Sequence, residues 1–247
     1  MENQFDPRQT GLSAATVGVP RAARDAGLRS YMLSVYNYMA SGVLLTGIVA
    51  LLFANSSLIN LLFNTATGQA SPLFWVVLFA PLGLVMWLSW GINRMSASTA
   101  QALFFVYAGI LGVQFSTLFL VYTGTSIAQT FFAVAAAFMG LSLWGYTTKK
   151  DLSGWGSFLI MGVFGIIIAS LVNIFLASSA LGFAISIIGV LVFTGLTAYD
   201  TQKIKEMYTV NDDGTIAGRK AIMGALSLYL DFVNLFLMLL RIFGDRR

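Results

Sequence analysis

Seven stretches of the chain are each apolar for about the length of a membrane crossing, and they decide what the chain can fold into. About 20 apolar residues cross the ~30 Å hydrocarbon core as a helix, and a helix is required because lipid offers the backbone no hydrogen-bond partners. The sequence therefore predicts an all-α membrane protein, a bundle of seven transmembrane helices in the lipid bilayer. The stretches are 32–53, 73–90, 97–121, 127–146, 158–176, 181–204 and 221–243.

Composition supports this class and excludes others. Charged residues make up 10% of the 247 residues, whereas a soluble domain carries about 25%. The chain has no Cys and no His, so it lacks thiol chemistry, the usual general base and the commonest metal ligand. We read the net charge of +4 as a signal of topology, with no nucleic-acid partner. Residues 1–30 are polar and are predicted to form a mobile cytoplasmic tail, followed by one transmembrane domain, residues 31–247.

The basic residues predict the orientation. The links 54–71, 122–126 and 177–180 carry no charge, and all but three of the 14 Lys and Arg residues lie in the tail and in the other links. Cytoplasmic segments are enriched in Lys and Arg, so the N-terminus is predicted to be cytoplasmic. Arg241 lies at the end of the seventh stretch, and Arg246 and Arg247 follow it. If the chain crosses the membrane seven times, these arginines lie outside, against the enrichment of Lys and Arg in cytoplasmic segments. A re-entrant last segment would keep them inside. The 23 residues of the seventh stretch are enough for a full crossing, which we favour.

Two carboxylates interrupt the last two stretches. Asp200 and Asp231 are expensive inside a membrane, about 2.5–3.5 kcal/mol at a helix centre, so they are candidate functional residues. At 1.5 Å per residue, Asp200 lies about 12 Å from the end of a helix that reaches residue 208, and Asp231 lies about 15 Å into the next helix. The matching depths predict that the two acids face each other. Ser227 and Asn234 are one turn from Asp231 and are predicted to support it. The alternative for Asp200 is an interfacial ion pair with Lys203.

Such a pair has a specific chemistry. Desolvation and a neighbouring like charge both favour the protonated acid, so the pair is expected to titrate as a unit with two macroscopic values. One shared proton would tie the two helices together, and the fully ionised pair would repel or bind a cation. Asp200 and Asp231 with carbonyls, Asn234 and water could form a weak transit site for Ca²⁺. Arg94, between the second and third stretches, is either a topology signal or a latch that reaches Asp200.

Three segments resemble the Bax inhibitor-1 (transmembrane Bax inhibitor motif) family, in particular its bacterial inner-membrane members. They are GYTTKKDLSGWG at 145–156, LTAYDTQKIK at 196–205 and ALSLYLDFVNLFLMLLRIFGDRR at 225–247. The resemblance implies seven helices with the last one central, and a pH-sensitive Ca²⁺ leak controlled by a di-aspartyl pair. The positions of that pair match Asp200 and Asp231, and Arg94 is the candidate for the family's basic latch.

Three functions remain open from the sequence. The first is a Ca²⁺-permeable leak channel or a proton-coupled cation exchanger gated by the acids, with Ca²⁺ and protons as partners and no cofactor. The second is a scaffold that regulates a membrane-bound protease or a stress response through a membrane-protein partner. The third is an intramembrane aspartyl protease, which the sequence disfavours because Asp231 lies in YLD rather than in a GxGD run. We therefore do not expect an enzyme.

Overall fold

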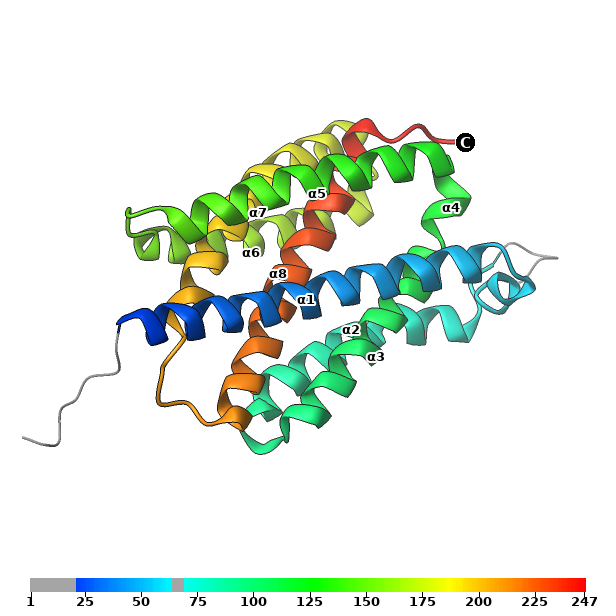
Figure 1. Cartoon of the computed structure of the whole chain (residues 1–247). Helices are drawn as coiled ribbons and strands as arrows, with labels where there is room; N and C mark the ends of the chain where they lie inside the picture. Colours follow the sequence, from blue (N-terminus) through cyan, green and yellow to red (C-terminus); the bar gives the residue numbers. More distant parts are fainter. Residues whose placement is uncertain (1–20, 64–68) are drawn as a thin grey trace, which may run out of the picture.

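The computed structural model describes residues 21–63 and 69–247, and it is built from seven long helices (Figure 1). All seven are long and apolar enough to cross a membrane, so the predicted fold class is confirmed. A short helix, α4 (Leu118–Val121), and two 3₁₀ turns, η1 (Ser57–Leu61) and η2 (Ile92–Arg94), join them. The long helices are α1 (Arg21–Ala54), α2 (Pro72–Gly91), α3 (Ala97–Phe115), α5 (Gly124–Thr147), α6 (Ser153–Leu176), α7 (Ser179–Glu206) and α8 (Gly214–Phe243).

Helices α1 and α8 begin well before their apolar stretches. Helix α1 begins at Arg21, nine residues before the predicted end of the tail at residue 30, and residues 1–20 lie outside the described part of the chain. Helix α8 begins at Gly214, seven residues before its apolar stretch. Its N-cap is Asp213, whose carboxylate accepts a hydrogen bond from the Ile216 backbone N–H at 2.7 Å. Such a cap satisfies one of the helix's free N–H groups, so polar turns can extend the helix beyond the hydrocarbon.

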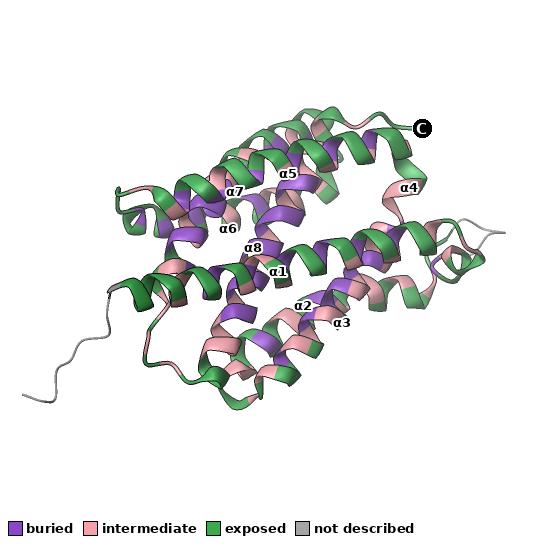
Figure 2. Cartoon of the chain, viewed as in Figure 1, coloured by how far each residue is buried: buried purple, intermediate pink, exposed green. Residues whose placement is uncertain are grey.

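Helix α8 is the centre of the bundle, as the resemblance implied. It packs against α7, α1, α5 and α3, while α2 and α6 lie on the outside (Figure 1). Most of its apolar window is buried, a larger share than in any other described span, and Figure 2 shows buried residues along most of its length. The outer helices instead expose large apolar side chains such as Trp90 and Phe175. Because water would not solvate such a surface, it is the face that contacts the lipid bilayer.

Helices α5 and α7 approach most closely at Gly145. A Cβ atom added at this glycine would clash with the Ala198 carbonyl oxygen and lie 3.0 Å from the Ala198 Cα. Ordinary contacts between carbon atoms are about 3.5–4.0 Å. The position therefore accepts only glycine at the observed helix separation, as small residues at membrane helix contacts generally permit close packing.

Three hydroxyl groups beside this contact join α1, α5 and α7. The Ser142 hydroxyl lies 2.6 Å from the Tyr36 hydroxyl and 2.9 Å from the Thr201 hydroxyl, and Thr201 donates to the Thr197 carbonyl at 2.7 Å. Each hydroxyl has a single proton. Since Thr201 uses its proton on the carbonyl, Ser142 must donate to Thr201, and Tyr36 must donate to Ser142. The three bonds thus form one directed chain from α1 to α7.

The C-terminal tail lies on the face opposite the start of α1 (Figure 1). It is fastened to the segment that precedes and opens α5. Thr123 N–H donates to the Asp245 carbonyl at 3.0 Å, Asp245 N–H donates to the Ser126 hydroxyl at 3.0 Å, and Arg247 N–H donates to the Val121 carbonyl at 2.9 Å. Helix α8 therefore crosses the whole bundle, and the re-entrant alternative is excluded.

Candidate functional site

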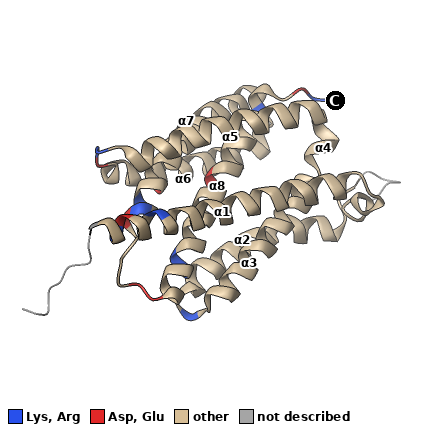
Figure 3. Ribbon diagram, in the orientation of Figure 1, with Lys and Arg blue, Asp and Glu red and all other residues tan. Residues whose placement is uncertain are grey.

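The two predicted acids lie on neighbouring antiparallel helices. Asp231 is 4% exposed, in the middle of α8, and Asp200 is partly buried on α7. Figure 3 shows the acidic position midway along α8, whereas the other charges gather towards the ends of the bundle. Asp200 acts electrostatically on Asp231 as a like charge. The structure therefore brings the two candidates together.

The register of α7 against α8 places the acids about one turn apart. A Cβ atom on Gly224 would touch Ile204, and one on Gly189 would touch Met238. Extending this pairing along both helices puts Asp200 level with the residues near position 228, and Asp231 about 5 Å deeper at 1.5 Å per residue. The depths predicted from the sequence, about 12 and 15 Å, differ by a similar amount and in the same direction.

In the described part of the chain, the burial of the Asp231 carboxyl group is not compensated by a hydrogen bond to its Oδ2 atom. Its Oδ2 atom is buried and has no hydrogen-bond partner among the described residues. Most buried polar groups are hydrogen-bonded, and leaving one unsatisfied costs about 1–3 kcal/mol. Packing alone would favour an apolar residue at this position. The carboxyl group is therefore a candidate for a role that requires a proton or a cation to come and go.

Asp200 is not neutralised by the neighbour that the alternative prediction named. The Lys203 Nζ atom lies 5.9 Å from the centre of the Tyr199 ring. Within the described residues, the ion pair with a contact below 4 Å is Lys220–Asp212, at 2.6 Å. Lys203 acts on Asp200 only through longer-range electrostatics. Asp200 therefore remains available to the second acid.

The supporting residues Ser227 and Asn234 lie beside Asp231 rather than in line with it. Both belong to a half-exposed stripe on α8, whereas Asp231 points into the bundle. The Asn234 Nδ2 donates to the Leu230 carbonyl at 2.8 Å, which leaves the Asn234 Oδ1 as an acceptor. Ser227 and Asn234 therefore border the buried face of α8 that carries Asp231.

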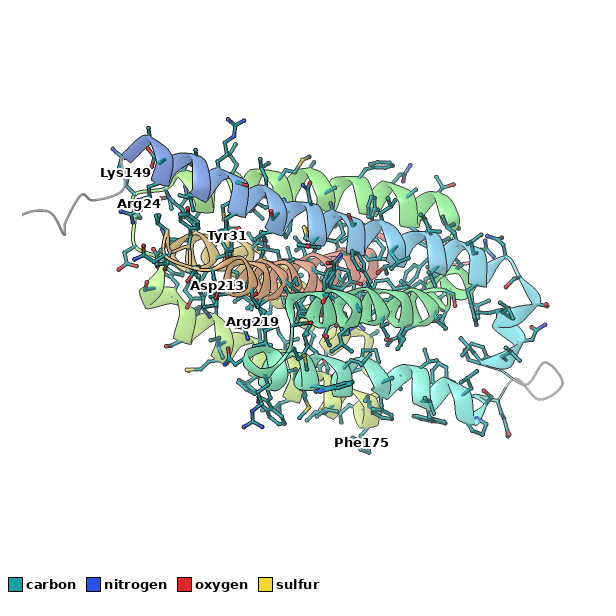
Figure 4. The ribbon with its side chains drawn as sticks, turned by 60° about the horizontal axis from the view of Figure 1, so that its bottom comes forward. Arg24, Tyr31, Lys149, Phe175, Asp213 and Arg219 are labelled. Carbon is teal, nitrogen blue, oxygen red and sulfur yellow. The ribbon has the colours of Figure 1, made fainter. Side chains whose placement is uncertain are left out.

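Arg94 is exposed at the end of η2, and no contact joins it to Asp200 in the described structure. A different arginine reaches this turn. Arg219, in the first turns of α8 (Figure 4), donates to the Asn93 carbonyl at 2.8 Å. Sequence reasoning missed Arg219 because it lies before the apolar stretch, in a segment expected to be a loop. The role of Arg94 as a latch stays a prediction.

Within residues 21–63 and 69–247, no three His, Cys, Asp or Glu side chains are grouped so that they could hold a metal ion. Ca²⁺ takes six to eight oxygen ligands. The two carboxylates and the Asn234 amide oxygen supply fewer side-chain ligands than that.

Comparison with known proteins decides the family. The model of the family described as "Inhibitor of apoptosis-promoting Bax1" matches residues 28–247. The chain belongs to the Bax inhibitor-1 family. It is 50% identical over 225 residues to the inner membrane protein YbhL of Escherichia coli K12, which covers 90% of this chain and 94% of YbhL. It is 51% identical over 224 residues to RP147 of Rickettsia prowazekii (90% and 92% covered), and 40% identical over 222 residues to YrjE of Lactococcus lactis (90% and 93% covered). As a member of this family with seven candidate spans, it is a multi-pass membrane protein.

Proposed function

We propose that this protein is a pH-sensitive leak for cations, Ca²⁺ among them, gated by the Asp200–Asp231 pair in a bacterial inner membrane. One observation carries the proposal: Asp231 is buried with an unsatisfied carboxylate oxygen in the most buried helix, beside a second acid. A residue with only a structural role would not be expected to bury an unsatisfied polar atom, because this lowers the stability of the fold. The location rests on the inner-membrane name of YbhL.

Protonation gives the pair two states. With one proton, the acids attract each other and hold α7 against α8. When both are ionised, they repel, and the helices separate or admit a cation between the carboxylates. Asp200, Asp231 and the Asn234 Oδ1 would then supply oxygen ligands in transit, which suits the preference of Ca²⁺ for oxygen. In this proposal the closed state is the one in which Asp231 is buried, and its exposure of only 4% supports that assignment.

The remaining roles follow from the same gate. Arg94 would act as a latch that binds Asp200, when that acid is ionised, from the face predicted to be cytoplasmic. The protein acts without a cofactor and without enzymatic chemistry. Its partners are lipid, protons and the permeant cation, and a membrane-protein partner belongs to the scaffold alternative.

The test measures Ca²⁺ flux into proteoliposomes across about pH 6 to 8, where a coupled acid pair in low dielectric is expected to change state. The wild type is compared with Asp200→Asn/Asp231→Asn and with Asp151→Asn, a control at an exposed acid in the α5–α6 turn. We expect a pH-dependent flux in the wild type and in the control, and a flat profile in the double variant.

Two results would contradict the proposal. A pH profile retained in the double variant would place sensing elsewhere. A flux no greater than that of empty liposomes would exclude the leak and favour the scaffold. The scaffold predicts that activity in cells survives the double variant and is lost when residues 1–30 are removed.

A further inference from the structure

The face that carries the C-terminus holds a pocket of about 1000 Å³, far from the acid pair along the bundle axis. It lies between the outer end of α6, the start of α7 and the C-terminal tail. Two guanidinium groups line it, those of Arg241 and Arg246, together with Asn173 and Ser178. No carboxylate lines it.

The polar groups of this pocket offer hydrogen-bond donors. The Asn173 Oδ1 accepts from the Ser178 N–H at 3.1 Å, so its Nδ2 is left to donate, and this atom sits 3.3 Å from the position of a Cβ on Gly182. The Ser178 hydroxyl accepts from the Leu181 N–H at 3.2 Å, which leaves its own proton free. The Arg241 and Arg246 guanidinium groups form no ion pair or hydrogen bond with any described residue. A set of donors with two positive charges and no acid suits an anion.

The backbone fixes one of the two arginines in place. Arg246 pairs with Tyr122 in an isolated antiparallel bridge, and hydrogen bonds from Asp245 and Arg247 secure the residues on either side. Arg241 lies in the last turn of α8. These backbone contacts hold Arg246 beside the pocket that it lines.

The distribution of Lys and Arg over the two faces of the bundle also suggests a ligand for the pocket arginines. The described Lys and Arg residues of the links lie on the other face, and Arg241, Arg246 and Arg247 lie on the face where the positive-inside rule predicts few. Topology therefore does not explain them.

Apolar side chains that are exposed on the outside of the bundle also line the pocket. Ile174 is 72% exposed and Phe183 is 52% exposed, and both line the pocket. The lining on α6 runs from Ala177 to Ser170, about 10 Å along the helix axis at 1.5 Å per residue. A charged rim above an apolar wall of this depth matches a phosphate headgroup followed by the upper part of an acyl chain.

We propose that this pocket binds the phosphate group of an anionic phospholipid, in the leaflet opposite the N-terminal face. Arg241 and Arg246 bind the phosphate oxygens, with the Asn173 amide and the Ser178 hydroxyl as further donors. The acyl chain lies along Ile174 and Phe183. The site is separate from the acid pair and does not depend on the leak function.

The test is lipid binding to the purified full-length protein in detergent. The chain has no Cys, so Ala180→Cys at the pocket gives a single site for a fluorophore that brominated phosphatidylglycerol quenches on contact. We compare Arg241→Gln/Arg246→Gln with Arg24→Gln, an exposed arginine at the opposite end of the bundle. Because the double variant loses two charge-assisted hydrogen-bond donors, the lipid concentration needed for half-maximal quenching should rise at least about tenfold. Arg24→Gln should leave that concentration unchanged.

Further arms identify the ligand. Glycerol 1-phosphate and brominated phosphatidylcholine are the soluble and the zwitterionic probes, and thermal unfolding followed by Trp fluorescence shows that each variant is folded. Equal quenching of the double variant and the wild type would overturn the site. Displacement by glycerol 1-phosphate at the lipid's own concentration would assign the pocket to a soluble phosphate and overturn the lipid. Equal affinity for phosphatidylcholine would overturn the selectivity for anionic lipid.

Discussion

Replacing Gly145 with alanine should force α5 and α7 apart. The new Cβ would clash with the Ala198 carbonyl oxygen and lie 3.0 Å from the Ala198 Cα, so the helices must separate by roughly 0.5–1 Å to reach an ordinary contact. The clashing atoms belong to the backbone, so a side-chain rotation cannot relieve them. Overpacking of this kind costs about 1–3 kcal/mol.

The separation would also break the hydroxyl chain three residues away. Ser142 and Thr201 are 2.9 Å apart, and widening by that amount takes them to roughly 3.4–3.9 Å, beyond a normal O–H···O bond. The loss of one or two such bonds adds about 0.5–1.5 kcal/mol each. We therefore expect Gly145→Ala to lower the free energy of unfolding by about 2–5 kcal/mol.

Gly140→Ala is the matched control. Gly140 lies on the same helix, is exposed, and has no atom within 4 Å of an added Cβ. There, alanine should be neutral or should stabilise by up to about 1 kcal/mol. The assay is unfolding of the purified protein in mixed detergent micelles, followed by Trp fluorescence. If Gly145→Ala were as stable as Gly140→Ala, the close α5–α7 packing described here would be wrong.

Two further predictions concern groups at the predicted cytoplasmic ends of the helices. Asp213→Ala removes the N-cap of α8 and should destabilise the protein by about 1 kcal/mol, measured in the same unfolding assay, and Asp213→Asn should retain most of the cap; equal stability of all three would refute the cap. Hydrogen bonding from Ser153 lowers the pKa of Asp151, which is fully exposed. The contribution of Asp151 to the stability of the fold is therefore present above the ordinary pKa near 3.8, and it is lost as pH falls through the lower pKa of the folded state. Asp151→Asn should accordingly be slightly less stable than the wild type at pH 7. The two should be equally stable once the wild-type carboxylate is fully protonated. A difference that grows in acid would contradict this sign.

The sequence predicted the number of spans and the pairing of their acids, because lipid imposes a length and a composition on each helix. It did not predict where helices continue into water. Hydropathy detects only the part in hydrocarbon, whereas the first turns of α1 and α8 are polar. The same limitation concealed Arg219, which lies in the first turns of α8.

The break between α3 and α4 was likewise missed. No Pro or Gly lies there. The Ser116 hydroxyl donates to the Val113 carbonyl at 2.6 Å, and the Thr117 hydroxyl donates to the Gln114 carbonyl at 2.8 Å. Such side-chain bonds compete with the helical ladder, but Ser and Thr also occur inside unbroken membrane helices, so their presence predicts no break. Contacts between distant residues, such as Tyr36 with Ser142, have no local signal at all.

The direction of the hydroxyl chain limits what it can transmit. A relay for protons must be able to reverse, with each hydroxyl turning to pass its proton on. Here the last acceptor is the Thr197 carbonyl, which cannot receive a proton and release another in turn. The hydroxyl chain therefore couples the helices mechanically and does not conduct protons. Movement of α1 at Tyr36 would displace Ser142 and then the part of α7 next to Asp200, without transferring charge to the acid pair.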